Sequence, residues 1–173
     1  MKNSIALSND EILVKGYIAR GKGYFNDGEI KKAFKTFSKA ILLNSEYAQA
    51  YLVKAEAHIE MYEVEEAEKC IVQYLKLVPG DATGYWKLVD IHDLTGDFDK
   101  CLYYCNKLLE NHGENAHIYL KKAEFLVLLN DFSKAIECFD ICLKLSPNCY
   151  EALCGKENAQ LSLCKNKMLP LYK

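Results

Sequence analysis

The sequence lacks any uninterrupted apolar stretch of about 18 residues, the length that a membrane-spanning helix needs. It also lacks a marked excess of charge, because 24 acidic residues oppose 22 basic ones and the formal net charge is −2. So small a net charge argues against the basic surface with which proteins bind DNA or RNA. The first ten residues are too few and too polar for a secretory signal peptide. We therefore expect a cytoplasmic protein with neither a nucleic-acid nor a membrane partner, and Met1 favours a natural N-terminus.

Metal-binding cysteine motifs are also missing, although the chain has eight cysteines. No two of them form a C-x-x-C pair, and none has a histidine partner at short range, as a zinc site would require. Cys101 and Cys105 are four residues apart, as are Cys138 and Cys142, so each pair would share one face of a helix. We interpret the cysteines as small apolar core residues, reduced in the cytoplasm, and we expect no metal and no cofactor.

What the sequence does contain is a repeat. Tyr17, Tyr51, Tyr85 and Tyr119 follow one another at intervals of 34 residues. A fixed period of this size indicates one supersecondary unit that is repeated and stacked. Two further positions recur with the same period, the first small and the second apolar. The small residues are Ala33, Ala67, Cys101 and Ala135, and the apolar ones are Phe37, Ile71, Cys105 and Phe139.

Four units follow without insertion, at 14–47, 48–81, 82–115 and 116–149. Within each unit apolar residues recur at spacings of three and four, which predicts two helices. Turn-forming residues separate these helices at Asn26-Asp27-Gly28, Thr95-Gly96-Asp97 and Asn130-Asp131, whereas Met61-Tyr62-Glu63 is a weaker turn signal. Pro79 and Pro147 end the second helix of their units.

This pattern resembles the tetratricopeptide repeat (TPR) family, which places aromatic, small and proline residues at fixed positions of a 34-residue unit. The first unit matches at Tyr17, Gly21, Tyr24, Ala33, Phe37 and Ala40, and the fourth matches at Tyr119, Ala123, Leu126, Ala135, Phe139 and Pro147. Units two and three depart more, with His58 and His92 at an aromatic position. The resemblance covers about 14–149.

The resemblance implies an all-α fold, a right-handed superhelix of four helical hairpins in one domain over residues 1–173. Residues 150–164 begin like another first helix but turn polar, so we expect a helix that caps the array. Residues 165–173 are expected to be a frayed tail. At the other end, Ser8 and Glu11 have the spacing of a capping box that begins the first helix.

Enzymatic chemistry is not supported by any motif. The segment Gly16–Gly23 approaches the phosphate-binding pattern G-x-x-x-x-G-K-[ST], but glycine replaces the hydroxyl residue and no strand precedes it. His58 and His92 occupy packing positions, His112 falls in a predicted loop, and His117 alone faces a position open to a ligand. No histidine has a nucleophile or carboxylate at the spacing of a catalytic triad. We therefore predict that the chain is not an enzyme.

The expected function is to bind a peptide or helical segment of another protein in the concave groove that first helices line in this family. Trp86, the single tryptophan, is the first candidate for a residue that dominates binding. By resemblance, the predicted groove residues are Lys15, Ile18, Lys22, Phe25, Gln49, Leu52, Val53, Glu56, Ile59, Trp86, Lys87, Asp90, His117, Leu120, Lys121 and Glu124.

Two other hypotheses stay open. The family's co-chaperones hold the C-terminal carboxylate of Hsp70 or Hsp90 with a clamp of Lys, Asn and Arg, and the corresponding residues here are Ile18, Lys22, Val53, Thr83 and Lys87. Only Lys87 keeps the charge of its site, so the clamp is absent and this function is less well supported. The second hypothesis is a structural protein that self-associates into homo-oligomers, suggested by the adjacent Tyr103 and Tyr104 and by the cysteines near the C-terminus.

Overall fold

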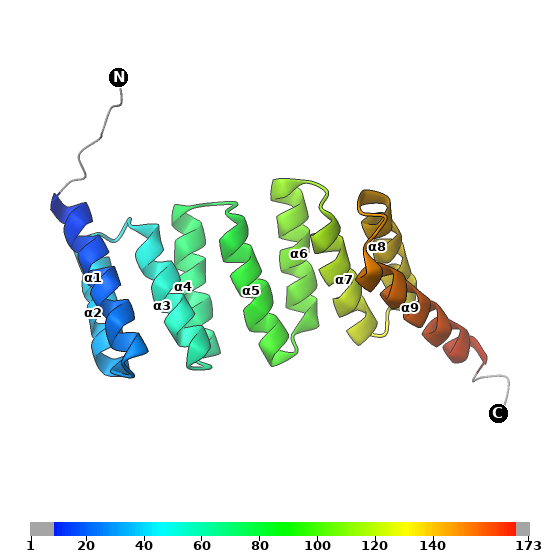
Figure 1. Cartoon of the computed structure of the whole chain (residues 1–173), viewed down its shortest axis with the longest axis horizontal. Helices are drawn as coiled ribbons and strands as arrows, with labels where there is room; N and C mark the ends of the chain where they lie inside the picture. Colours follow the sequence, from blue (N-terminus) through cyan, green and yellow to red (C-terminus); the bar gives the residue numbers. More distant parts are fainter. Residues whose placement is uncertain (1–8, 169–173) are drawn as a thin grey trace, which may run out of the picture. The chain divides into compact units, whose positions relative to one another are not determined.

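The chain folds into α-helices joined by short turns. The computed structural model describes residues 9–168, and over these residues it contains nine helices and no strand. They are α1 (Asn9–Asn26), α2 (Ile30–Leu43), α3 (Ala48–Glu60), α4 (Val64–Leu77), α5 (Ala82–Thr95), α6 (Phe98–His112), α7 (Ala116–Leu128), α8 (Phe132–Leu145) and α9 (Tyr150–Met168). Figure 1 shows these helices connected one after another by turns of a few residues. The predicted all-α fold of repeated helical hairpins is confirmed.

The described helices belong to two compact units, an N-terminal and a C-terminal one, which divide between Gly84 and Tyr85. In the N-terminal unit α1 packs against α2 and α3 against α4, while α2 and α1 both contact α3. In the C-terminal unit α7 packs against α8, α8 against α9, and α7 also contacts α6 and α9. Within each unit, therefore, hairpins stack so that first helices contact first helices. The continuous domain over 1–173 and its four repeat boundaries stay predictions.

Small residues let the helices of a hairpin come close together. In the N-terminal unit the buried Ala33, Phe37, Val53 and Ala57 form one cluster, in which the Phe37 side chain is 1% exposed. A Cβ atom added to Gly21 of α1 would lie 2.4 Å from Cε1 of the Phe37 ring, which is closer than two carbon atoms can approach. The absence of a side chain at Gly21 thus determines the distance between α1 and α2.

The tyrosines that revealed the repeat are packing residues. All four are half-buried. Tyr17 packs against the cluster of Val14, Ala40 and Ala50, and Tyr119 packs against the core of the C-terminal unit. The rings of Tyr17 and Tyr119 thus fill space between helices.

The turn inside each hairpin repeats the same backbone geometry. Gly28, Tyr62, Gly96 and Asn130, spaced by 34 residues, all have positive φ, at 75°, 59°, 71° and 60°. In each case the next amide donates a hydrogen bond to a carbonyl five residues earlier, for example Glu63 N to His58 O at 2.9 Å. This is the Schellman arrangement that ends a helix on a left-handed residue. Three turns use glycine or asparagine there, and one uses tyrosine.

The second hairpin compensates for its tyrosine with a side-chain bond. His58 Nδ1 and Glu63 Oε2 lie 2.6 Å apart, so the imidazole and the carboxylate bridge the two helices around the turn. In the third and fourth hairpins the equivalent residue is Asp97 or Asp131, whose carboxylate accepts a hydrogen bond from the third backbone amide after it. Aspartate therefore caps α6 and α8, whereas Glu63 makes no cap bond to α4.

The last helix is longer than predicted. α9 continues to Met168, so the expectation that the tail begins at residue 165 is wrong for residues 165–168. Ala152 and Ala159 on this helix are buried against Phe139 and its neighbours, while most of the remaining side chains are exposed. This is how a helix that caps the core of the C-terminal unit would pack. The predicted tail beyond 168 and the capping-box residue Ser8 lie outside the described residues.

We expect Tyr62→Gly to stabilise the protein. Tyr62 is 79% exposed, so the protein loses little packing when the ring is removed. A non-glycine residue in the left-handed region destabilises the fold by about 1–2 kcal/mol. The free energy of unfolding, measured by guanidinium denaturation, should rise by about 1 kcal/mol. Asn130→Gly is the matched control and should change stability less, because asparagine tolerates this conformation. If the Tyr62→Gly protein is no more stable than the parent, the conclusion that the positive φ of Tyr62 is destabilising is contradicted.

Two glycines of α1 should respond in opposite directions to alanine. Gly21→Ala pushes a Cβ into the buried Phe37 ring and should lower the free energy of unfolding by about 1–3 kcal/mol. At Gly23 an added Cβ would meet no atom within 4 Å. Gly23→Ala should therefore raise the free energy of unfolding by about 0.5–1 kcal/mol, because alanine has the higher helix propensity. Both are measured by chemical denaturation. Shifts of the same sign would contradict the role given to Gly21.

Candidate peptide-binding surface

The sixteen predicted groove residues all lie on the first helices of the hairpins. Four are on α1, five on α3, three on α5 and four on α7. Their exposure differs. Lys15, Lys22, Gln49, Asp90 and His117 are exposed, and Leu52 and Val53 are buried. The other nine are half-buried, namely Ile18, Phe25, Glu56, Ile59, Trp86, Lys87, Leu120, Lys121 and Glu124.

Leu52 and Val53 contribute little surface to a ligand. Leu52 is 6% exposed and Val53 is 2% exposed. The Val53 side chain belongs to the core cluster with Phe37 and Ala57. These two side chains therefore belong to the core of the N-terminal unit.

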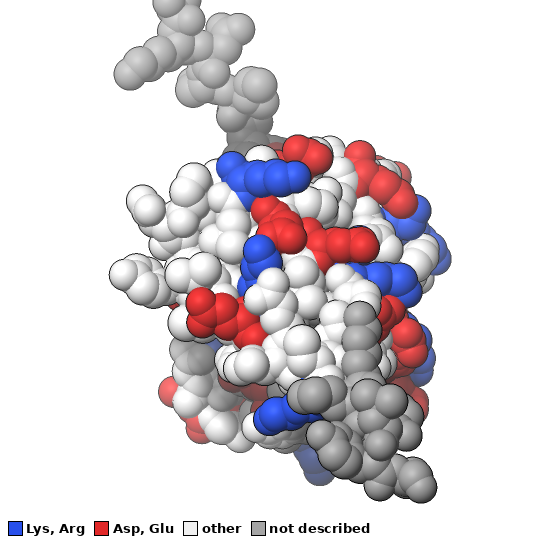
Figure 2. Space-filling view, turned by 90° about the vertical axis from the view of Figure 1, so that its right-hand side faces the viewer, with Lys and Arg blue, Asp and Glu red and all other residues white. Residues whose placement is uncertain are grey.

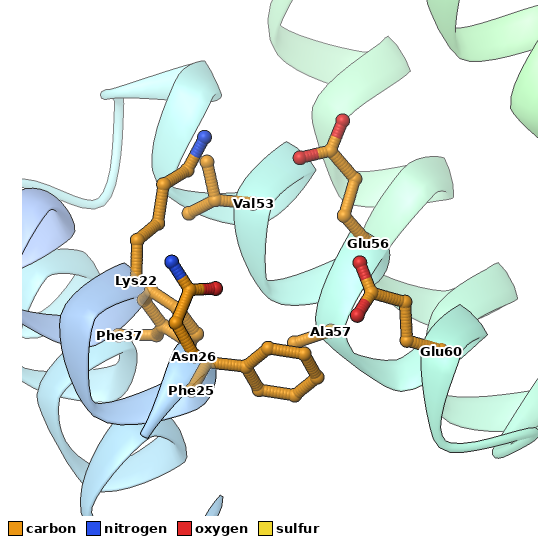
Figure 3. A pocket seen from close by; sticks show the side chains of 8 residues that line it. All are labelled: Lys22, Phe25, Asn26, Phe37, Val53, Glu56, Ala57 and Glu60. Atoms are coloured by element: carbon orange, nitrogen blue, oxygen red, sulfur yellow. The ribbon is translucent and has the colours of Figure 1, made fainter. Parts of the chain in front are cut away.

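In the N-terminal unit, side chains of α1 and α3 line a pocket of about 200 Å³ (Figure 3). Four predicted residues take part, namely Lys22, Phe25, Val53 and Glu56. The other four lining residues were not among the predicted groove residues, namely Asn26, Phe37, Ala57 and Glu60. Glu60 lies one helical turn after Glu56, so the spacing of four residues was the signal that could have identified it.

The walls of this pocket differ in chemistry. Lys22 and Asn26 extend from α1, and the carboxylates of Glu56 and Glu60 extend from α3 on the opposite side (Figure 3). Between them the Phe25 ring reaches from α1 towards α3, and it packs against the cluster that contains Phe37 and Val53. The pocket thus has hydrogen-bond donors on one wall, carboxylates on the other and an apolar floor.

In the C-terminal unit, α5 and α7 present an aromatic pair. The rings of Trp86 and His117 lie 5.0 Å apart at an interplanar angle of 44°. Trp86 is half-buried, which leaves part of the indole accessible, and His117 is exposed. Leu120 of α7 packs against the core of this unit and is half-buried.

Charged side chains accompany this pair. Lys121 donates a hydrogen bond to Glu124 at 2.8 Å, and this bond raises the pKa of the lysine. Although Asp90 is exposed as a residue, desolvation of its carboxyl by neighbouring atoms raises the pKa of that group, and the nearby Lys87 and Lys121 oppose that effect. These polar side chains make the surface around Trp86 amphipathic.

The histidines predicted at packing positions are buried, as expected. His58 is 8% exposed and its ring stacks on Phe34 with centroids 4.3 Å apart. His92 is 2% exposed and stacks on Tyr104 at 5.5 Å. The segment Gly16–Gly23 lies inside α1, so its backbone forms no phosphate-binding loop. Within residues 9–168 no cluster of three or more His, Cys, Asp or Glu side chains has the arrangement of a metal site.

The cysteines divide into three groups, and Cys70 and Cys149 form the half-buried one. Cys101, Cys105, Cys138 and Cys142 are buried, which confirms their prediction as core residues. Burial raises the pKa of Cys101 and of Cys105 to about 12, so these thiols are protonated and unreactive near neutral pH. Cys154 and Cys164 are exposed, and for them the interpretation as core residues is wrong.

The charge pattern of the surface agrees with the composition. On the face that Figure 2 shows, acidic and basic side chains alternate among uncharged ones, and the described residues form no large area of one sign there. None of the helices in the described part of the chain is long and apolar enough to cross a membrane.

Comparison with known proteins places the repeat in a family. The model of the tetratricopeptide repeat matches residues 116–149, which are the predicted fourth unit. A curated relative, tetratricopeptide repeat protein 21B of Xenopus laevis, is 31% identical over 67 residues, or 39% of this chain. The chain covers 5% of that protein's length.

Solved structures share the fold at low sequence identity. A tetratricopeptide repeat protein from Parabacteroides merdae has a TM-score of 0.76 at 14% identity, with 88% of this chain and 60% of that chain covered. The first TPR of Spaghetti (RPAP3), solved with an HSP90 peptide, has a TM-score of 0.59 at 16% identity, with 70% of this chain and 96% of that chain covered.

The hairpins, their stacking and these likenesses define an all-α helical repeat protein, a class whose fold generally serves protein–protein interaction and not catalysis. Residues 116–149 match the tetratricopeptide repeat, and the chain resembles tetratricopeptide repeat proteins in fold, as the sequence predicted.

Proposed function

We propose that the chain is a non-enzymatic interaction module that binds a peptide or helical segment of a partner protein on the first-helix faces of its hairpins. The observation that carries this proposal is the pocket between α1 and α3, where residues from two successive first helices line one recess. A recess shared by neighbouring repeats suits a segment that runs across them.

The surface around Trp86 supports the same function. Tryptophan is enriched among the residues that dominate protein interfaces, because it combines a large apolar ring with a polar N–H group. Here the ring is partly accessible and is flanked by His117. We further propose a cytoplasmic setting, where the buried thiols of Cys101, Cys105, Cys138 and Cys142 would remain reduced.

The test begins with a displayed library of random peptides selected on the immobilised protein, followed by fluorescence anisotropy on the enriched peptides. We expect Trp86→Ala, alone and combined with Leu120→Glu, to raise the dissociation constant by about 30-fold or more, because truncation of a dominant aromatic residue costs about 2 kcal/mol or more.

Tyr103→Ala is the matched control, since Tyr103 is an aromatic residue of the second helix α6 and is 54% exposed. It should leave the affinity unchanged. Circular dichroism establishes that each variant is folded. Folded Trp86 variants that bind with the parent's affinity would overturn the assignment of this surface.

Self-association is the second candidate, and exposed leucines favour it. Leu42 of α2 is 87% exposed and Leu13 of α1 is 52% exposed, and both line a shallow depression with Tyr17. A second copy of the chain would cover such apolar side chains. Light scattering over a concentration series should then show a mass that rises with concentration in the parent and less so in Leu42→Glu. A constant monomer mass would remove this candidate.

A further inference from the structure

The pocket between α1 and α3 is too small for an ordinary small-molecule ligand. Its volume is about 200 Å³, whereas ligand pockets commonly measure about 300–1,000 Å³. A space of this size accommodates a single side chain. The occupant is therefore best sought among the side chains of the peptide that the proposed function requires.

The charges on the walls select the kind of side chain. Glu56 and Glu60 carry two carboxylates on the α3 wall, and Lys22 carries the one cationic group among the eight lining residues. A carboxylate entering from the partner would face both glutamates, whereas a cation would be attracted by both. Glu60 is exposed and Glu56 is half-buried, so at least one of these carboxylates lies at the mouth of the pocket.

The floor favours arginine over lysine. The Phe25 ring extends across the pocket below the Glu60 carboxylate in Figure 3 and offers an aromatic face beside an acceptor. A planar guanidinium stacks on an aromatic ring and donates two parallel hydrogen bonds to a carboxylate, and a lysine ammonium does neither. The donors of Lys22 and Asn26 on the opposite wall would accommodate a carbonyl oxygen of the peptide backbone.

We infer that this pocket binds an arginine side chain of the partner peptide, stacked on Phe25 and paired with Glu60 and Glu56. The inference rests on the proposed function, because it needs a peptide on the first-helix surface. It specifies the chemistry of the partner, a basic segment, and it separates this chain from repeats that hold an acidic C-terminus.

The experiment compares three proteins in the same random-peptide selection. They are the parent, Glu56→Gln/Glu60→Gln, and the control Glu65→Gln/Glu68→Gln, which removes the same two charges from α4. We expect one peptide position to be enriched in arginine on the parent and on the control, and the enrichment to be lost on Glu56→Gln/Glu60→Gln. Circular dichroism and denaturation verify that all three are equally folded.

A double-mutant cycle then localises the contact. For one selected peptide, replacing the arginine with citrulline removes the charge and keeps the shape, and we expect binding to the parent to weaken by about tenfold or more. The same replacement should have little effect on binding to Glu60→Gln. Lysine in place of arginine should recover part of the affinity, because it restores the charge without the planar fork.

The outcomes separate the two proposals. Peptides that depend on Trp86 but show no preference for arginine would overturn the arginine pocket and leave the interaction function standing. Arginine enrichment that survives Glu56→Gln/Glu60→Gln, or that is lost equally in the α4 control, would also overturn the pocket, because the arginine is then held elsewhere or by overall charge. A selection that captures no peptide would overturn both.

Discussion

The contact between a buried phenylalanine ring and a residue without a side chain determines how closely the helices of this protein pack. Phe37 meets Gly21 in this way in the N-terminal unit, and Phe139 meets Gly155 in the C-terminal unit. In both cases a Cβ on the glycine would lie 2.4 Å from a ring carbon. A helical hairpin of about 30 residues buries too little apolar surface to be stable alone, so its stability also depends on contacts with the next hairpin, such as those in the cluster of Phe37 with Val53 and Ala57 of α3. The candidate site depends on them as well, because Phe37 also lines the pocket between α1 and α3.

The turn geometry shows how packing overrides local preference. The residue with positive φ recurs at intervals of 34, and tyrosine takes this position once, at Tyr62. Two features hold the second hairpin nevertheless. The Glu63 amide donates to the His58 carbonyl, and the side chains of the same two residues bond at 2.6 Å. His58 in turn stacks on Phe34 of α2, so the turn is tied to the neighbouring hairpin as well as to its own helices.

The sequence was sufficient to predict the helical hairpins, because the tyrosine period and the turn residues are local signals that packing reinforces. It was also sufficient to predict that the two cysteine pairs are buried, because a spacing of four residues puts both members of a pair on one helix face. The burial of Leu52 and Val53 was not predictable in the same way. Which side of α3 is covered depends on how far α1 and α2 extend over it, and a repeat pattern carries no measure of that distance. The predicted end of the last helix, at residue 164, was too early. The polar residues of α9 predict that its side chains are exposed, but an exposed helix can continue through polar residues, so they do not mark where it ends.

The proposed arginine pocket between α1 and α3 would let one repeat framework change its specificity without changing its fold. Phe25, Phe37, Val53 and Ala57 serve packing and form the floor, so substitutions there alter the fold together with the site. Lys22 and Glu60 are exposed, and exposed charges contribute little to stability, so substitutions at these two positions should leave the fold unchanged. The sign of the charge at the mouth of the pocket is therefore free to vary while the framework stays constant. A carboxylate ligand would need donors where this chain has Glu56 and Glu60, and the same apolar floor would then hold a different peptide.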